Sequence, residues 1–434
     1  MRNDQYTLKG LILGVIFLVA AFLPNVTQAQ EDLTSLRLKT NFNIWRVNLA
    51  TADWLNTYPK LSWNGFDVKL PEDMDGGIKD KTLTKLNASE AIGVDYAAVK
   101  RYLEKTASPE LDREPQDVTI SLDEKGKVKF EGFAFNGQAI DFERAFYLIR
   151  KAIQDKIEEV RLPLKVIPAK VTVLSDELKQ KGITELISTG ETNFKNSPNN
   201  RRINIKVGLA SFSGQLIPPG TESGAGKILG RVDDTTGYKK ELVIKGDKTV
   251  PEFGGGLCQV STTVYRSLLI GGFPITARTN HSYAVSYYDP QGLDATIYPP
   301  DPDMKFINDT SNSILLQTTT VGDKAYSNVY GTAVDRQVDL IGPWYYAFTN
   351  IPPARTEYTD KLAPGEKQIL GAAHGGFKAD WYRRITYAYP SQKEKLERIH
   401  SDYEARPNYT LIGAEPGSPN IASENGTGSV FIAP

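Results

Sequence analysis

The sequence predicts an α+β protein with several domains. These are an α/β unit in the N-terminal half, a central α+β unit in which a cysteine-bearing helix packs against a sheet, and a small all-β module near the C-terminal end. Three observations support this prediction. The 434 residues suffice for roughly two to four domains of common size. Helical periodicity and strand-like alternation are interleaved as far as residue 333, and residues 354–415 carry few helical signals.

Helix caps and alternating runs define the N-terminal unit. Asp95 and Asp141 each precede a run of apolar residues at helical spacing, so each is expected to cap a helix. Residues 118–122 and 127–130 alternate between apolar and polar on either side of a turn, which predicts a hairpin. Residues 160–167 read as a further strand at an edge of the sheet.

The central unit is expected to place one long helix among strands. A run of glycines opens a helix over residues 254–270, and two further glycines end it. Alternating apolar residues predict a half-buried strand at 201–209. Further strands are expected at 275–288, 295–298 and 314–318.

Composition shifts divide the chain into six segments. We expect a signal peptide (1–29), an entry segment (30–84), an α/β domain (85–172), a central α+β domain (173–333), a small β domain (350–415) and a disordered tail (416–434). The formal net charge of -1 gives no general attraction to nucleic acid, so no nucleic-acid partner is expected.

The first residues have the order of a secretory signal. Arg2 and Lys9 precede the apolar run 11–23, and small residues at 27–29 resemble a cleavage site. The run is shorter than the roughly 20 apolar residues of a spanning helix, which favours cleavage. We therefore expect an extracytoplasmic protein, secreted or associated with the cell envelope, which contacts the membrane only if the signal stays uncleaved.

The single cysteine, Cys258, stands where a thiol could be reactive. Three glycines precede it, and it falls in the first turn of the predicted helix. Free N–H groups and the positive end of the helix dipole stabilise a thiolate there. On a helical wheel the thiol lies on the flank of an apolar stripe that starts at Leu257, which suits a group that faces a cleft.

A histidine and an aspartate follow the cysteine in order. His281 comes 23 residues after Cys258, and Asp294 comes 13 residues after His281. A thiol on a helix, a histidine base on one strand and an orienting aspartate on the next would form a thiol triad. This order resembles the transglutaminase-like and papain-like hydrolase core. The bland alternative is that Cys258 is a small buried apolar residue and His281 a satisfied polar one.

The residues around the thiol are candidates for binding. Tyr265 or backbone N–H groups near Cys258 could hold an oxyanion. We expect a ligand to be surrounded by Gly254, Gly255, Gly256, Gln259, Tyr265 and Ser282. The sequence indicates no cofactor, and no cluster has the spacing of a metal site.

Several blocks together resemble the VanW family. They are residues 221–230, 237–238, 250–265, 280–282, 292–297 and 303–308. Residues 85–172 resemble the peptidoglycan-binding domain that often precedes VanW domains, and residues 354–415 look like the G-five domain that often follows them. The resemblance implies a cell-envelope location near peptidoglycan or another cell-wall glycan. The family name comes from vancomycin-resistance gene clusters, and the resemblance implies no particular reaction.

Two functions of different classes remain open from the sequence, so whether the protein is an enzyme stays undecided. The first is binding or maintenance of peptidoglycan, with Trp381, Tyr382 and Tyr387 as glycan-binding candidates; their alternative role is strand packing. The second is a cysteine-dependent acyl transferase or amidase that acts on peptidoglycan peptides, with Cys258 as nucleophile, His281 as base and Asp294 orienting the imidazole.

Overall fold

The computed structural model describes residues 33–63, 66–68, 87–245, 248–298, 300–371, 373–388 and 393–418. The expected signal peptide and most of the expected disordered tail lie outside these residues. Within the described ranges the protein is a mixed α+β structure, rich in strands that form several small sheets, as the sequence predicts. No helix in these ranges combines the length and the hydrophobicity that crossing a membrane requires.

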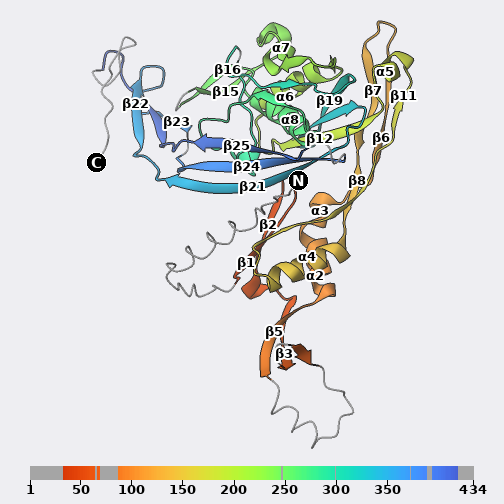
Figure 1. Cartoon of the computed structure of the whole chain (residues 1–434). Coiled ribbons are helices and arrows are strands. Elements are labelled where there is room, and N and C mark those ends of the chain that lie inside the picture. Colours follow the sequence, from red (N-terminus) through yellow and green to blue (C-terminus); the bar gives the residue numbers. More distant parts are fainter. Residues whose placement is uncertain are drawn as a thin grey trace, which may run out of the picture.

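The N-terminal unit packs three helices on a small sheet, and helices and sheet lie below the central sheets in Figure 1. Its elements are β1 (Ser35–Lys39), β2 (Ile44–Asn48), η1 (Leu49–Thr51), β3 (Leu55–Trp63), β4 (Phe66–Val68), β5 (Asn87–Val94), α2 (Tyr96–Thr106), α3 (Ser108–Leu111), α4 (Phe142–Gln154) and β9 (Glu159–Arg161). The two predicted caps are confirmed, because Asp95 and Asp141 each accept a hydrogen bond from a backbone N–H of the first helical turn. Trp54 anchors the core between the helices and the sheet.

A second group of strands connects this unit to the centre of the molecule. It consists of β6 (Gln116–Leu122), β7 (Val128–Phe135), β8 (Gly137–Ile140), β10 (Leu164–Ile167), β11 (Val171–Val173) and α5 (Asp176–Gln180). The predicted hairpin is confirmed, since β6 pairs antiparallel with β7. Val118 and Ile120 on this hairpin share a core with Leu315 and Tyr330 of the central sheet. The packing therefore crosses the boundary expected between residues 172 and 173.

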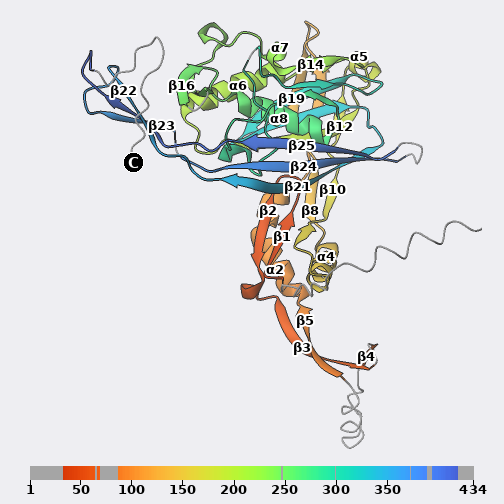
Figure 2. The same ribbon diagram turned by 60° about the vertical axis from the view of Figure 1, so that its left-hand side comes forward.

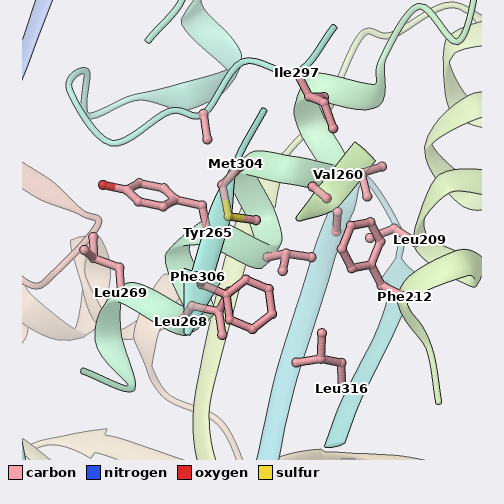
Figure 3. Packing of buried hydrophobic residues seen from close by; sticks show 14 of the residues in the cluster. Leu209, Phe212, Val260, Tyr265, Leu268, Leu269, Ile297, Met304, Phe306 and Leu316 are labelled. Atoms are coloured by element: carbon pink, nitrogen blue, oxygen red, sulfur yellow. The ribbon is translucent and has the colours of Figure 1, made fainter. Parts of the chain in front are cut away.

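The central unit consists of a four-stranded sheet covered by two long helices. Its elements are β12 (Glu185–Asn193), α6 (Asn199–Phe212), β13 (Leu216–Ile217), β14 (Glu222–Gly224), α7 (Ala225–Leu229), η2 (Asp234–Thr236), β15 (Lys240–Lys245), β16 (Lys248–Phe253), α8 (Leu257–Ile270), β17 (Ile275–Ala277), η3 (Ser286–Tyr288), β18 (Lys305–Ile307), β19 (Ile314–Val321) and β20 (Lys324–Gly331). The sheet has the order β12-β20-β19-β13. Figure 3 shows Val260 and Leu268 of α8 packed with Phe212 of α6 and Leu316 of β19. The cysteine-bearing helix thus packs against a sheet, as predicted.

The strand predicted at 201–209 is wrong, because this segment lies within helix α6. The alternation that suggested a strand comes from Ile203, Ile205 and Val207. Ile203 and Val207 are only half-buried, and Ile205 is buried by the helix as well. Ile205, Leu209 and Phe212 are the buried apolar residues, and their spacing of four and three is helical. Packing against α8 and β19 favours the helix, because the alternation of a strand through Ile205 and Leu209 would not place Phe212 on the same buried face.

Two further strand predictions fail in the loops that follow α8. Of the range 275–288 only Ile275–Ala277 is a strand, and 295–298 is irregular. In these segments the backbone N–H and C=O groups form hydrogen bonds with side chains in place of the hydrogen bonds between strands. The Ala295 N–H donates to Thr262 Oγ1 at 3.0 Å, and the Ala295 carbonyl accepts from Ser261 Oγ at 2.5 Å. Polar residues on α8 therefore fix the loop directly.

The described residues after 333 hold two three-stranded sheets and no helix. The strands are β21 (Arg336–Thr349), β22 (Arg355–Thr359), β23 (Lys367–Gly371), β24 (Gly376–Tyr387), β25 (Lys395–Tyr403) and β26 (Tyr409–Gly413), in the orders β21-β24-β25 and β22-β26-β23. β21 begins before the expected module boundary at 350. Figure 2 shows β21, β24 and β25 side by side beneath α8. Leu340 and Trp381 extend the central core into this sheet.

Candidate active site

Glycines set the geometry of the chain as it enters α8. Gly256 is the N-cap residue, with a left-handed φ of 115° that other residues rarely adopt. A Cβ at this position would lie 3.0 Å from Arg201 Cγ and 3.3 Å from Ile205 Cγ1. The backbone of this turn therefore packs closely on α6, which fixes the direction in which the first turn of α8 points.

Cys258 lies in that first turn, half-buried at the edge of a groove of about 1130 Å³. Its Sγ lies 3.7 Å from the Ile297 carbonyl oxygen. The apolar stripe predicted for the helix is confirmed, since Leu257, Val260, Val264 and Leu268 are buried. The thiol is thus on the flank of the stripe and borders the groove, as the helical wheel predicts.

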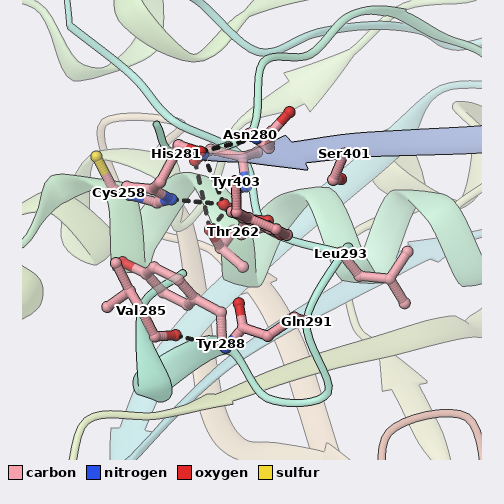
Figure 4. Close-up of polar contacts among 12 residues, drawn as sticks. Cys258, Thr262, Asn280, His281, Val285, Tyr288, Gln291, Leu293, Ser401 and Tyr403 are labelled. Carbon is pink, nitrogen blue, oxygen red and sulfur yellow. Dashed lines mark hydrogen bonds and ion pairs between the residues drawn. The ribbon is translucent and has the colours of Figure 1, made fainter. Parts of the chain in front are cut away.

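His281 and Asp294 form the rest of the predicted constellation. The imidazole Nδ1 lies 2.6 Å from Asp294 Oδ2, which also accepts the His281 backbone N–H at 2.8 Å. The Cys258 thiol and the His281 imidazole lie close enough for each to shift the pKa of the other. Because Nδ1 is engaged by the carboxylate, Nε2 is the ring nitrogen that remains for the thiol. Figure 4 shows the Cys258 sulfur beside the His281 ring.

The structure therefore brings all three predicted residues together, with the histidine in the middle. The secondary structure around them differs from the expectation, because neither His281 nor Asp294 lies on a strand. Both side chains are buried, with exposed fractions of 4% and 1%. A buried histidine held by a buried carboxylate has one orientation, which is what a base that serves a thiol requires.

The charges of the site favour a thiolate paired with an imidazolium. Burial alone would raise the pKa of the Cys258 thiol, but the charge of His281 and its hydrogen bond lower that pKa below its ordinary value. Burial alone would lower the pKa of His281, but Cys258 and Asp294 raise it to about 9. Burial opposes ionisation of Asp294 too, yet its bond to His281 holds its pKa well below the usual range.

Two residues that the sequence did not reveal shape the imidazole side of the site. Tyr288 stacks on the His281 ring with centroids 4.9 Å apart and planes at 21°. The charge of Arg201 on α6 acts on Tyr288 and contributes to lowering the pKa of Cys258. The expected strand at 201–209 hid Arg201, because a helix is needed to direct this side chain to the groove.

The carboxylate of Asp294 is held by two further side chains. Arg278 Nη2 lies 3.2 Å from Asp294 Oδ1, and Arg278 Nε donates to the Asp294 carbonyl at 2.6 Å. The Tyr403 hydroxyl donates to the same Oδ1. Arg278 lies close enough in sequence for a motif to include it, whereas Tyr403 is 109 residues from Asp294 and gave no local signal.

The predicted binding residues divide into two groups. Gly254, Gly255, Gly256 and Ser282 line the groove. Gln259 is fully buried, where its side chain contacts Arg201 and the Asn193 carbonyl, and does not line the groove. Tyr265 is only 1% exposed, lies beneath Arg278 and does not line the groove, so its ring does not face the space where an oxyanion would form.

One of the glycan-binding candidates is also misplaced. Trp381 is 1% exposed, and its indole N–H donates to the Gln291 carbonyl at 2.8 Å. It therefore packs against the central unit and cannot present a ring to a glycan. Tyr382 and Tyr387 are half-buried.

Within the described part of the chain, no group of three or more His, Cys, Asp or Glu residues is placed to hold a metal ion.

Fold and site together define a mixed α+β protein with a Cys–His–Asp site on the edge of a groove. Comparison with known proteins agrees with the sequence motifs: residues 200–330 match the family model described as VanW like protein. The chain is 28% identical over 175 residues to the Uncharacterized protein YoaR of Bacillus subtilis, covering 38% of this chain and 57% of that protein. It is also 28% identical over 136 residues to the Vancomycin B-type resistance protein VanW of Enterococcus faecalis, covering 30% of this chain and 49% of that protein.

Residues 200–330 are therefore a VanW-like region within the longer chain. The chain spans about half the length of the two curated relatives. The matched region includes Cys258, His281 and Asp294, together with Arg201 and Arg278. Tyr403 and the whole of the sheet β21-β24-β25, called the C-terminal sheet below, lie beyond it.

Proposed function

We propose that the protein is a cysteine-dependent acyl transferase or amidase that acts on peptides of the cell wall. The observation that carries the proposal is the grouping of Cys258 and His281 at one groove, with the His281 imidazole bonded to Asp294 and close enough to lower the pKa of the thiol. An ordinary buried cysteine needs no imidazole beside it, and a structural histidine needs no thiol. Their pairing supports nucleophilic chemistry over the reading of Cys258 as a packing residue.

The reaction follows from the positions of the three side chains. The Cys258 thiolate attacks the carbonyl carbon of an amide and forms a C–S bond. The imidazolium of His281 gives its Nε2 proton to the leaving amine as the C–N bond breaks, which leaves a thioester and a neutral imidazole. An amine or water then attacks the thioester while His281 takes its proton, and the Cys258 thiolate is released. Asp294 stays ionised throughout and stabilises the imidazolium.

The first turn of α8 supplies the means to stabilise the oxyanion of this reaction. The helix dipole is positive at this end. The N–H groups of Leu257 and Gln259 already donate to the Gly254 and Gly256 carbonyls, so the Cys258 N–H is the candidate donor of the first turn. The glycines at 254–256 line the groove and carry no side chain that would keep a carbonyl group away. The Cys258 N–H therefore replaces Tyr265 as the candidate for this role.

The cell wall is proposed as the substrate for two reasons. One curated relative is named as a vancomycin resistance protein. The first 29 residues have the pattern of a secretory signal, so the protein is expected to reach the compartment that contains the wall. The groove is lined by both apolar and polar residues, among them Leu242, Pro251, Asn280 and Ser282, which suits a peptide with a hydrogen-bonding backbone.

The proposal is tested by incubating the protein with soluble disaccharide peptides released from purified peptidoglycan and following the products by mass spectrometry. We expect cleavage or exchange of an amide bond, which Cys258→Ala abolishes and His281→Gln slows strongly. The matched control is His400→Gln, because His400 also pairs with an aspartate, its Nδ1 lying 2.7 Å from Asp380 Oδ1, but does not line the groove. Equal activity of the Cys258→Ala protein would refute the proposal.

A specific surface supports wall binding as a second candidate function. The face of β21 turned away from the core carries Trp344 and Tyr346, which are 47% and 37% exposed. Tyr382 on β24 packs edge-on against Trp344, with ring centroids 5.5 Å apart. Exposed aromatic side chains gathered on one face mark interaction surfaces. Here Trp344 takes the place that the sequence suggested for Trp381.

This second candidate predicts that the protein sediments with purified peptidoglycan sacculi. Trp344→Ala should lower the bound fraction, because it removes the largest exposed ring of the face. Val321→Ala is the control, since Val321 is an exposed apolar residue on the central sheet. Undiminished sedimentation of the Trp344→Ala protein would exclude this face as the binding surface.

A further inference from the structure

Strand β25 runs along the two loops that carry His281 and Asp294. Hydrogen bonds join the strand and the residue after it to these loops, among them Glu404 N–H to the Ser282 carbonyl at 2.7 Å, Arg278 Nη1 to the His400 carbonyl at 3.0 Å, and Ser401 Oγ to the Gly292 carbonyl at 3.1 Å. The strand thus contacts the segments on both sides of the imidazole–carboxylate pair. It comes from a sheet that lies outside the region shared with the family model.

Tyr403, the last residue of β25, reaches the triad itself. It is 1% exposed, and its hydroxyl accepts the Gly292 N–H at 2.8 Å while donating to Asp294 Oδ1. Burial and the nearby Asp294 charge raise the pKa of Tyr403, so the phenol keeps its proton and remains a donor. Figure 4 shows the Tyr403 side chain beside His281. One hydroxyl therefore ties the backbone before Asp294 to the carboxylate.

We infer that Tyr403 is a positioning residue of the candidate active site, and that the site is complete only when the C-terminal sheet is docked. The inference rests on the proposed function, because it concerns the orientation of the same imidazole. Asp294 uses Oδ2 for His281, and its Oδ1 is held by Arg278 and Tyr403. Both oxygens must be held to keep the carboxylate plane aligned with Nδ1 of the imidazole.

Removal of the hydroxyl has two physical consequences. Asp294 Oδ1 keeps only the 3.2 Å contact with Arg278, so the carboxylate can rotate away from His281. The Gly292 N–H is left without its acceptor, which loosens the loop in front of Asp294. A less well held carboxylate stabilises the imidazolium less, and the Cys258 thiolate loses part of its counter-charge.

The test compares Tyr403→Phe with Tyr345→Phe in the otherwise unchanged protein. Tyr345 is the matched control, since its hydroxyl accepts the Gln291 N–H at 3.2 Å, one residue from Gly292, but does not contact the triad. Cys258 is the single cysteine, so its alkylation by iodoacetamide across a pH series reports the thiolate alone. We expect Tyr403→Phe to move the midpoint of this profile to higher pH and to slow the acyl reaction roughly 10- to 100-fold. Tyr345→Phe should leave the midpoint in place.

Each outcome decides a separate question. An ordinary thiol midpoint in the unaltered protein would refute the proposed function itself. A depressed midpoint that Tyr403→Phe leaves unchanged, or that both variants shift equally, would overturn the positioning role and leave the proposed function standing. If Tyr403→Phe does not fold, 3-fluorotyrosine placed at position 403 keeps the shape of the ring and changes the acidity of its hydroxyl. An unchanged midpoint in that protein would overturn the inference as well.

Discussion

Replacing His281 with glutamine isolates the contribution of the imidazole to the reactivity of Cys258. Glutamine retains hydrogen-bonding groups but cannot carry the positive charge that lowers the thiol pKa. The largest influence left on Cys258 is burial, which raises its pKa above the ordinary value of 9.0. In the unaltered protein the imidazolium persists up to about pH 9, so the thiolate has a counter-charge throughout the neutral range.

The size of the effect follows from the pKa values. The pKa of His281 rises from 6.5 to about 9, which at 1.36 kcal/mol per unit corresponds to roughly 3 kcal/mol of net stabilisation of the imidazolium, after the opposing effect of burial. A thiol with a pKa of 9 is about 1% ionised at pH 7, so complete ionisation raises the thiolate fraction about 100-fold. We expect His281→Gln to slow alkylation of Cys258 at pH 7 by about 10- to 100-fold.

The assay is the rate of iodoacetamide alkylation measured by intact-protein mass spectrometry between pH 5 and pH 10. The unaltered protein should react at neutral pH, and the His281→Gln protein should approach that rate only in alkaline solution. The His400→Gln protein serves as the control and should follow the unaltered protein. Indistinguishable profiles for the His281→Gln and unaltered proteins would refute the reasoning, since the imidazole would then have no influence on the thiolate.

Three further predictions concern the same site. Asp294→Asn should lower turnover by about 10²- to 10⁴-fold, because an amide holds the wrong tautomer of His281; turnover within threefold of the unaltered protein would contradict this. Gly256→Ala should lower the free energy of unfolding by about 1–3 kcal/mol in urea titrations, because alanine is strained at a φ of 115° and its Cβ would press on Arg201. Gly220→Ala is the control for a strained φ alone, because a Cβ at position 220 has nothing within 4 Å. The pKa of His281 is about 9 in the folded protein and 6.5 in the unfolded chain. Its contribution to stability is therefore complete below pH 6.5 and is lost as the pH rises through 9. The difference in stability between the unaltered and His281→Gln proteins should shrink over that range, and a difference that grows would contradict the prediction.

The sequence contained enough information to find the three central residues of the site. A lone cysteine after three glycines, followed by histidine and aspartate, is a local sequence pattern. Such a pattern can be recognised without knowledge of the fold. The structure brings His281 and Asp294 together even though their loops are not strands. The site requires that Asp294 Oδ2 bonds both the His281 backbone N–H and the imidazole Nδ1. A loop can place these groups as well as paired strands can.

Other features depended on contacts that no local pattern records. Arg201 was hidden because apolar residues at 203, 205 and 207 alternate like a strand, and only packing against α8 shows that the segment is a helix. Tyr403 contacts Asp294 across 109 residues of sequence. Trp381 was assigned to glycan binding because exposure cannot be read from residue type, and its burial appears only when its sheet docks beneath α8.

The most direct measurement is the mass of the protein after brief incubation with peptidoglycan peptides and acid quenching. We predict a population heavier by one acyl group, attached to the peptide that contains Cys258 and removed by hydroxylamine. The adduct should be missing from the Cys258→Ala protein. Consumption of the peptides without any adduct on Cys258, at a rate that Cys258→Ala leaves unchanged, would contradict the account.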